Sequence, residues 1–441
     1  MIDFTKGNVT KNILMFTIPI LLSNIFQQFY NIADFFIINK AMGVDGLASI
    51  GSVSTAYNLL ICFVSNTILG FSIKISKSYG AKDYQNTLNY IINTIILSLF
   101  VGIILTVVSL MIYKKLLISL NTPLSILKIS SNYFIILIIG LIFATTYNMF
   151  SHIFRALGNT KISLYIIIIS SILNVLLDFI LVVILKKGIC GAAFATIFSQ
   201  FTSSLMSFLY FLFKYKYFFS LKNSNYKVSN TIFDQLKMGF TMGFTSSIVF
   251  LGTLSLQGSV NSLGTDVIAG HSFARQISEI YMQPLSSISS SVTILTSQNI
   301  GAKNIIRIKK GINKCFKISY IWCFFIIYIT FFHMNIISTI FGIKINSSTY
   351  LIAFSYLKLN TLFYFALSGL FILRNLLIGF ENKIIPSLSS CTEFIIKIII
   401  AYFLVKKIGY NAIIICEPIT WILSTFWILI YLLSHKKLLI S

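Results

Sequence analysis

The chain has 441 residues, of which 56% are hydrophobic and only 10% are charged. This composition excludes a water-soluble globular protein and indicates an integral membrane protein. The formal net charge of +23 at pH 7 does not indicate nucleic acid as a partner, because the basic residues are scattered over short loops and form no continuous face. Attraction to anionic membrane lipid explains this charge better.

Twelve apolar runs follow one another along the chain, each long enough for a helix to cross about 30 Å of hydrocarbon. They lie near residues 13–38, 49–73, 88–113, 130–151, 162–185, 190–213, 233–260, 268–297, 313–341, 349–372, 384–405 and 411–433. A transmembrane barrel would show short alternating segments, whereas these runs are continuously apolar. The expected fold class is therefore an all-α polytopic membrane protein with twelve transmembrane helices.

Part of the sequence occurs twice at a spacing of 221 residues. The segment from Gly43 to Ala48 returns as Gly264 to Ala269, the tripeptide Gly80-Ala81-Lys82 returns as Gly301-Ala302-Lys303, and Gly158 is matched with Gly379. Three matches at one spacing indicate two related halves, as in many secondary transporters. We expect an N-terminal six-helix lobe at 1–213, an inter-lobe linker at 214–232 and a C-terminal six-helix lobe at 233–441.

The lysine and arginine residues predict the orientation of the helices. With a cytoplasmic N-terminus, the inner segments hold 22 basic residues and the outer loops hold 9, while Arg275, Lys358 and Lys397 lie within spans. Six helices per half make the repeats parallel. We therefore predict a multi-pass protein of the prokaryotic plasma membrane with both termini, and the linker, in the cytoplasm. Because both halves are in one chain, a monomer is sufficient.

Acidic side chains within spans are functional candidates, because a carboxylate at the bilayer centre is costly. The first span carries Gln27, Tyr30, Asn31 and Asp34 on one helical face. The fifth carries Asn174 and Asp178 one turn apart, and Thr196 in the sixth lies at a similar depth. Together Asp34, Asn174, Asp178 and Thr196 could bind a proton or Na⁺ through oxygen atoms. The alternative is that each acid extends to the outer headgroups.

The second half does not copy these residues. Ser255 is 221 positions after Asp34, and with a two-residue gap allowed Glu393 and Lys397 are the expected counterparts of Asn174 and Asp178. A Glu–Lys pair at this spacing tends to neutralise itself, so we expect ion coupling in the first half.

The eighth span holds a second polar group. His271, which we expect at the polar outer edge, is followed at steps of four by Arg275 and Glu279, and Gln257 ends the span before. Arg275 and Glu279 form either a structural ion pair or a substrate contact through Glu279. Pro19 removes a backbone hydrogen bond in the first span and is a candidate hinge or a static kink.

Several motifs in order along the chain carry a family resemblance. They are Pro19 through Asp34, the Gly-Ala-Lys-Asp run at 80–83, Arg155 through Lys161, Asn174 with Asp178, Gly188 through Thr196, and Gln298 through Lys303. This set resembles the bacterial type of the multidrug and toxic compound extrusion (MATE) family.

The resemblance implies two lobes in a V around a central cavity that faces each side of the membrane in turn. It also implies export driven by inward proton or sodium flow, with Asp34, Asn174, Asp178 and Thr196 as the cation site of the first lobe. Asn159 stands where many relatives have Asp, and Ser278 stands where an acid is expected, with Glu279 one position later. The resemblance therefore does not carry an ion site onto the second lobe.

The sequence predicts a secondary antiporter that exports amphipathic, cationic small molecules in exchange for H⁺ or Na⁺, with no cofactor beyond the coupling ion. Candidate substrate contacts are Gln27, Tyr30, Asn31, Gln257, Arg275 and Glu279. A flippase for lipid-linked sugars or peptidoglycan precursors is the alternative, although it should place more cations in its spans to hold pyrophosphate. An enzyme is not expected, since the chain has no HExxH, nucleotide-binding glycine loop or protease motif.

Overall fold

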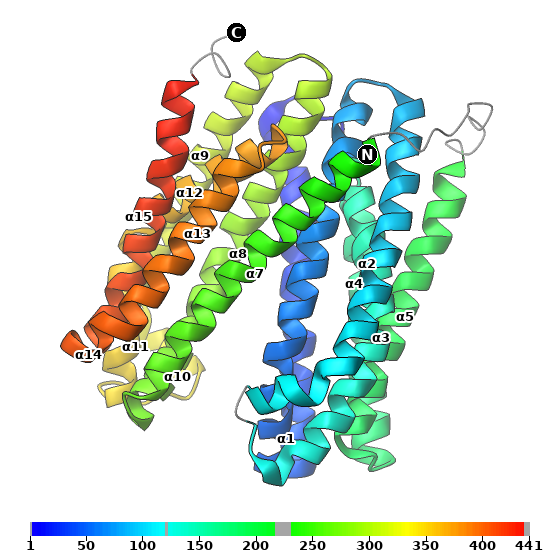
Figure 1. Cartoon of the computed structure of the whole chain (residues 1–441). Coiled ribbons are helices and arrows are strands. Elements are labelled where there is room, and N and C mark those ends of the chain that lie inside the picture. Colours follow the sequence, from blue (N-terminus) through cyan, green and yellow to red (C-terminus); the bar gives the residue numbers. More distant parts are fainter. Residues whose placement is uncertain (1, 120–121, 217–230, 436–441) are drawn as a thin grey trace. The chain divides into compact units, whose positions relative to one another are not determined.

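The computed structural model describes residues 2–119, 122–216 and 231–435, and within them every regular element is a helix (Figure 1). In the first half these are α1 (Val9–Gly80), α2 (Tyr84–Ser119), α3 (Leu124–Ala156), α4 (Lys161–Asp178), the wide-turn π-helix η1 (Phe179–Ile184) and α5 (Gly188–Lys214). In the second half they are α7 (Thr231–Asn261), α8 (Thr265–Gly301), α9 (Ile305–Phe332), α10 (Met334–Ile340), α11 (Ser348–Leu362), α12 (Tyr364–Gly379), α13 (Ile384–Ile399), the π-helix η2 (Ile400–Leu404), α14 (Val405–Ile408) and α15 (Tyr410–Ser434). The expected all-α, multi-span fold is confirmed.

Ten helical segments among the described residues are long and apolar enough to cross a membrane, and the bent pair α11–α12 makes an eleventh. The remaining predicted span corresponds to α8, which has 37 residues but a more polar composition. Two predicted boundaries are wrong. The span at 313–341 ends at Phe332, and the span at 349–372 is broken at Phe363, where the two helices meet at 54°.

Helix α1 contains two spans, Val9–Gly43 and Ser49–Gly80, because the backbone turns sharply at Gly43. Gly43 has φ 63° and ψ −149°, and its counterpart Gly264 has φ 100° and ψ 164°. A side chain would be strained in both conformations, so glycine is required at the same point of each half. Gly188 and Gly409, again 221 positions apart, both have φ 59°.

The match of Gly158 with Gly379 is wrong. The residue that shares the left-handed turn of Gly158, with φ 80°, is Glu381, with φ 63°. The Gly158 N–H donates a hydrogen bond to the carbonyl of Arg155, three residues back. The Glu381 N–H donates in the same way to the carbonyl of Ile378. Equivalent residues of the two halves are thus 223 positions apart at this turn, and they are 221 positions apart again at Gly188 and Gly409. Glu393 is therefore not the counterpart of Asn174, since the correct spacing points to residues 395–397.

The chain forms two compact units. One comprises Met1–Asp3 and Ile18–Phe244, and the other comprises Phe4–Thr17 and Thr245–Ser441. Helix α1 contributes to both, and the change of unit falls between Thr17 and Ile18, directly before Pro19. Of the predicted linker 214–232, residues 217–230 lie outside the described part of the chain, and the lobe boundaries at 213 and 233 stay predictions.

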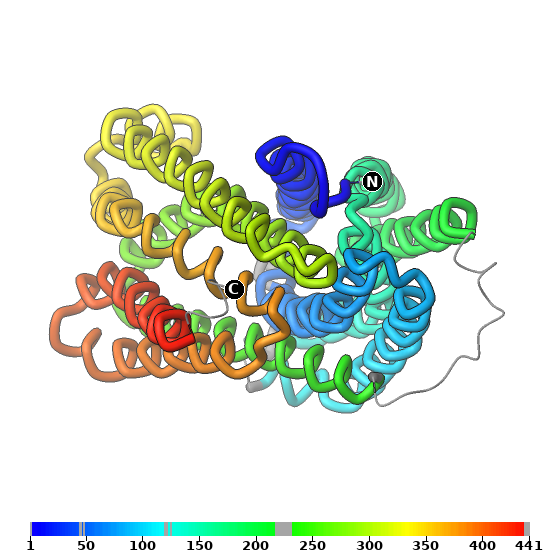
Figure 2. Tube along the Cα trace, turned by 90° about the horizontal axis from the view of Figure 1, so that it is seen from above, coloured from blue at the N-terminus to red at the C-terminus, as the bar shows by residue number. Residues whose placement is uncertain are grey.

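Each unit has its own apolar interior. In the second unit, α8, α11, α12 and α15 meet around Tyr356, Tyr364 and Trp421, all nearly or fully buried. Figure 2 shows α13 (orange) beside α15 (red), which pack along their length. In the first unit, α3 packs on both α2 and α5. Large apolar side chains also cover the outer surface, such as Met111 at 76% and Phe324 at 66% exposure, which is the pattern of lipid-facing helices.

Glycine permits a close helix contact within the first unit. A Cβ at Gly70 in α1 would lie 2.6 Å from Cα of Gly239 in α7, and a Cβ at Gly239 would lie 2.1 Å from the Phe71 ring. Small residues allow helix backbones to approach closely in membranes, where dispersion contacts replace hydrophobic driving force.

We expect Gly70→Ala to destabilise the protein by about 1–3 kcal/mol, because the added methyl group meets backbone that cannot move aside. Thermal unfolding of the purified protein in detergent would show this as a lower midpoint temperature. Gly51→Ala, in the same span and with nothing within 4 Å of its Cβ, is the matched control and should not lower it. Equal midpoints for the two variants would contradict the close contact.

Candidate ion and substrate site

A cavity of about 370 Å³ lies inside the first unit. Its wall is built by the two spans of α1 together with α3, α4 and α5. The polar side chains that line it are Gln27, Tyr30, Asn31, Asp34, Ser54, Tyr57, Asn58, Tyr133, Tyr147, Asn148, Ser170, Ser171, Asn174, Thr196, Ser199, Gln200 and Ser203. Its size lies within the range of small-molecule sites.

The structure places all four residues of the polar face of the first span on this wall. Gln27, Tyr30, Asn31 and Asp34 lie on successive turns of the helix, at steps of three and four residues, and each lines the cavity. Helical periodicity therefore locates one side of the cavity correctly. Asn174 of α4 and Thr196 of α5 line the same cavity from other helices.

Asp178 does not line the cavity but lies next to Asp34. Its side chain is fully buried, and neither of its carboxylate oxygens has a hydrogen-bond donor among the described residues. Oδ1 of Asp34 is likewise buried without a donor. Two adjacent carboxylates in an apolar span cannot both be charged at low cost. A shared proton or a bound cation would remove the repulsion between the two carboxylates, because it supplies the positive charge that no neighbouring side chain of the described structure supplies.

Asn174 and Thr196 add further polar atoms near these acids. Asn174 is 1% exposed, and neither its amide oxygen nor its amide nitrogen has a partner in the described structure. The Thr196 hydroxyl donates to the carbonyl oxygen of Ala192 at 3.0 Å, which leaves its lone pairs available. Carboxylate, amide and hydroxyl oxygens are ligands that suit a hard cation.

The backbone changes from α-helix to π-helix directly after Asp178. In η1 the Leu185 N–H donates to the carbonyl of Ile180 at 2.8 Å, five residues back, instead of four. Single wide turns of this kind are frequent at functional sites. The same feature occurs in the second half at η2, 221 positions later, so it belongs to the repeated scaffold.

Sequence reasoning missed the contributions of the second and fourth spans to the wall and found only one residue of the sixth. Tyr57 and Gln200 hydrogen-bond to each other across the cavity wall, with the Gln200 Nε2 donating to the Tyr57 hydroxyl at 3.2 Å. The available signal was a polar face in α5, where Thr196, Ser199 and Gln200 follow helical spacing. Only Thr196 was selected, because its partners on other helices are not visible in the sequence.

The acids of the second unit are arranged differently, because each of the two buried ones has a cation beside it. The Lys397 Nζ lies 3.1 Å from Oε1 of Glu417, and Arg275 Nη1 lies 3.6 Å from the same oxygen. The side chains of Lys397 and Glu417 are 4% and 8% exposed. Lys397 also donates to the Thr253 hydroxyl at 3.2 Å. The expected Glu393–Lys397 pair is therefore wrong.

Glu393 instead pairs with Arg374 of α12, which also donates to the Ser389 hydroxyl at 2.8 Å. Arg374 was placed outside the spans by the sequence, but α12 extends to Gly379 and encloses it. The side chains of Arg374 and Glu393 are 14% and 7% exposed. The described part of the second unit thus keeps Glu393 and Glu417 neutralised by neighbouring helices.

The remaining candidates of the second unit differ in their burial. Glu279 is 57% exposed and only 3.9 Å from Arg275, so that its pair is weak. Gln257 is half-buried and donates to the Asn261 side chain on its own helix at 3.0 Å. His271 is 5% exposed and its Nδ1 lies 3.2 Å from the Tyr410 hydroxyl, so its side chain is buried between helices, while its place near the outer edge stays a prediction.

The described residues contain no group of three or more His, Cys, Asp and Glu side chains gathered for a metal ion. A Na⁺ site at Asp34 and Asp178 would need neutral oxygens as well, and Asn174 and Thr196 are residues of that type on the cavity wall.

Comparison with known proteins finds a matching family model and related bacterial sequences. A model of the family described as MatE matches the chain twice, at residues 19–180 and 241–403. The probable multidrug resistance protein YpnP of Bacillus subtilis is 29% identical over 304 residues, which are 68% of this chain and 67% of YpnP. The multidrug export protein MepA of Staphylococcus aureus is 24% identical over 209 residues, which are 47% of this chain and 46% of MepA.

Solved structures also share the fold. A crystal structure of MATE in the bent conformation has a TM-score of 0.88 at 20% identity and covers 100% of this chain and 99% of its own. An outward-facing multidrug resistance MATE transporter has a TM-score of 0.89 at 20% identity, with coverages of 100% and 98%. A Pyrococcus furiosus transporter, described as having a binding pocket of reverse polarity, has a TM-score of 0.87 at 19% identity, with coverages of 99% and 98%.

The ion pairs of the second unit generate a stability prediction. Glu417→Gln should destabilise the protein by about 3–5 kcal/mol, because it leaves Lys397 buried without its countercharge. Glu279→Gln is the matched control, since this acid also pairs with Arg275 but is largely exposed, and it should change stability by less than about 1 kcal/mol. Thermal unfolding in detergent measures both. A stable Glu417→Gln protein would contradict the assigned pairing.

Proposed function

The chain belongs to the MatE family of transporters, and from that premise we propose that it exports amphipathic organic cations in exchange for H⁺ or Na⁺. The family assignment rests on matches that cover both halves of the chain. It confirms the resemblance seen in the sequence motifs. The names of the similar bacterial proteins, which are multidrug resistance and export proteins, support a drug-like small molecule as substrate.

The observation that carries the proposed coupling is the pair of adjacent acids, Asp34 and Asp178, without a cationic partner among the described residues. One of them, Asp34, lines the cavity, and the other is fully buried behind it. A proton or Na⁺ entering this site removes the repulsion between the two charges. An organic cation in the cavity would lose its attraction to Asp34 at the same moment.

The proposed mechanism is competition for the same negative charge. The substrate binds in the cavity near Asp34, and the coupling ion binds at Asp34 and Asp178. Each neutralises the site, so the two cannot bind well together. On this mechanism they favour different arrangements of the first lobe. A ligand can shift two conformations only through its different affinity for each. Binding of the ion on one side of the membrane then expels substrate, and release of the ion on the other side restores its site.

Coupling through the second lobe is not part of the proposal. Its two buried acids, Glu393 and Glu417, already have arginine or lysine within ion-pairing distance. A coupling ion would have to displace the paired arginine or lysine side chain, which is part of the chain and cannot diffuse away. We propose one coupling site per chain, in the first lobe.

The rival function, translocation of a lipid-linked pyrophosphate, would favour free cations at the cavity. Among the described residues, the wall of the 370 Å³ cavity contains no lysine or arginine and carries Asp34 instead. In the second unit Arg275, Arg374 and Lys397 all face carboxylates. This distribution of charge favours a cationic substrate.

Export of a fluorescent organic cation from proteoliposomes tests the coupling. We expect an imposed proton or sodium gradient to drive export by the wild type, and Asp178→Asn and Asp34→Asn to reduce it to the level of protein-free liposomes. Asp266→Asn is the control, because Asp266 is an exposed acid that bonds to the Ser348 hydroxyl. Undiminished gradient-driven export in Asp178→Asn would refute the coupling site. Failure of both gradients with folded wild-type protein would favour the lipid-linked substrate.

The hinge at Pro19 gives a second expectation. The Pro19→Ala variant restores the missing backbone N–H and stabilises the straight form of α1 by about 3 kcal/mol. We expect export to slow severalfold while the fold and dye binding persist. Pro284→Ala, inside α8 and within one unit, should leave the rate near that of wild type. Stopped-flow dye export with parallel equilibrium dye binding separates rate from affinity. An unchanged rate for Pro19→Ala would indicate a static kink.

A further inference from the structure

A second cavity, of about 730 Å³, lies in the second unit between α9 and the beginning of α1. Lys310, Lys314 and Lys317 of α9 line it together with Asn8, Val9, Thr10, Asn313, Phe316 and Tyr320. It is separate from the candidate ion site, which belongs to the first unit. The proposed transport cycle makes no use of these lysines.

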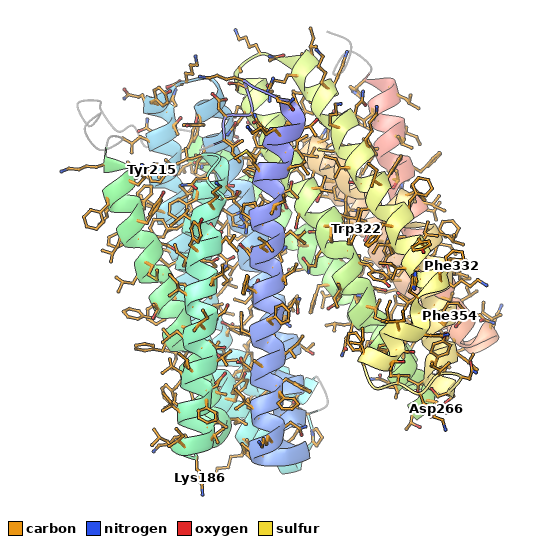
Figure 3. The ribbon with its side chains drawn as sticks, turned by 180° about the vertical axis from the view of Figure 1, so that it is seen from behind. Lys186, Tyr215, Asp266, Trp322, Phe332 and Phe354 are labelled. Carbon is orange, nitrogen blue, oxygen red and sulfur yellow. The ribbon has the colours of Figure 1, made fainter. Side chains whose placement is uncertain are left out.

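The lysines are the first half of a longer stripe on α9. Lys310, Lys314 and Lys317 are followed at the same alternating steps of four and three by Ile321, Phe324 and Tyr328, which places all six on one helical face. The three apolar members are 70%, 66% and 53% exposed. Figure 3 shows this helix with Trp322 near its middle and Phe332 at its C-terminal end. The stripe thus changes from three positive charges to exposed apolar surface along one helix.

Aromatic rings widen the apolar half of this face. Tyr320 packs edge-to-face on Phe316, with centroids 5.6 Å apart, and on Phe365 of α12 at 5.2 Å. Phe324 contacts the same Phe365 ring at 5.0 Å. The rings form a surface on the outside of the unit that could hold an acyl chain.

The N-terminal segment forms the opposite wall of the cavity, and hydrogen bonds from α8 and α9 hold this segment in place. The Arg307 Nη2 donates to the carbonyl of Gly7 at 2.8 Å, and Asn299 Nδ2 donates to the carbonyl of Phe4 at 3.1 Å. Phe4 is 1% exposed and stacks edge-to-face on Phe16. Residues 8–10 are therefore fixed against α9, and the cavity is a built feature of the fold.

No acid neutralises the three lysines. The cavity lining contains no Asp or Glu, and in the described part of the chain none of the three lysines has a carboxylate within 4.0 Å. Lysines at the end of a span often extend to the headgroups without a specific ligand. Three of them around one cavity, continuous with an apolar face, instead match an anionic headgroup that has an acyl chain.

We propose that this cavity binds one anionic phospholipid, with its phosphate among Lys310, Lys314 and Lys317 and an acyl chain along Ile321 and Phe324. The exposed apolar half of the stripe favours a phospholipid over free phosphate, which would use only the basic half. The lipid would contact α9 and the first turn of α1 together, and so stabilise their packing. This proposal does not depend on the transport activity.

Native mass spectrometry of the full-length protein in detergent tests it, with dioctanoyl phosphatidylglycerol, dioctanoyl phosphatidylcholine and inorganic phosphate as probes. We expect wild type to retain one phosphatidylglycerol in preference to phosphatidylcholine. The triple variant Lys310→Gln, Lys314→Gln, Lys317→Gln should weaken phosphatidylglycerol binding at least about tenfold, since each lysine contributes to the attraction. The control triple Lys214→Gln, Lys237→Gln, Lys309→Gln removes the same charge from residues outside the cavity and should retain the lipid.

Three results would overturn the proposal. They are equal loss of phosphatidylglycerol in both triple variants, equal binding of both lipids by wild type, and unchanged phosphatidylglycerol binding in Ile321→Ser, Phe324→Ser. The last result, together with tight inorganic phosphate binding, would identify a phosphate site instead. Thermal unfolding confirms folding of each variant. If the lysine triple does not fold, the single variant Lys314→Gln provides the same comparison, with an expected severalfold loss.

Discussion

The cost of placing a carboxylate in hydrocarbon governs the arrangement of polar residues in this protein. An acid within a span must be protonated, be paired with a cation or reach water. Glu393 and Glu417 are paired with side chains of neighbouring helices. Asp34 and Asp178 have no such partner in the described structure and lie next to each other. On the proposed mechanism, the same physical requirement is met at this acid pair by an ion from outside.

The two halves show how a duplicated backbone can acquire different chemistry. The turns at Gly43 and Gly264, the turns at Gly188 and Gly409, and the π-helices after α4 and α13 are common to both. These features depend on backbone conformation and are preserved by glycine or by helix geometry. The charges depend on single side chains and have diverged. On the proposed mechanism, Lys397 occupies in the second half the role that a mobile cation has in the first.

Much of this architecture is predictable from the sequence, because membrane helices need long apolar runs and repeated turns need glycine. The polar face from Gln27 to Asp34 is also predictable, since helical periodicity is a property of one segment. The partners of Glu393 and Lys397 are not, because spacing rules consider neighbours on the same helix while the true partners, Arg374 and Glu417, come from other helices.

Two further differences have the same origin. The turn at Glu381 contains a left-handed residue that is not glycine, so the sequence match to Gly379 selected the wrong position. The break at Phe363 has no proline or glycine to signal it. The cavity residues Tyr57 and Gln200 come from different helices, and only their hydrogen bond shows that they belong together. Contacts between segments determine all of these features.

Helix α1 contributes residues to both cavities. Its first turns line the lysine cavity, its residues up to Thr17 belong to the second unit, and its remainder belongs to the first. Pro19 stands directly after this change, where a backbone hydrogen bond is absent. Asp34 follows about 22 Å further along the helix at 1.5 Å per residue. On the proposed hinge, a bend at Pro19 would move the part of α1 that carries Asp34, because the helix continues without another proline between the two residues.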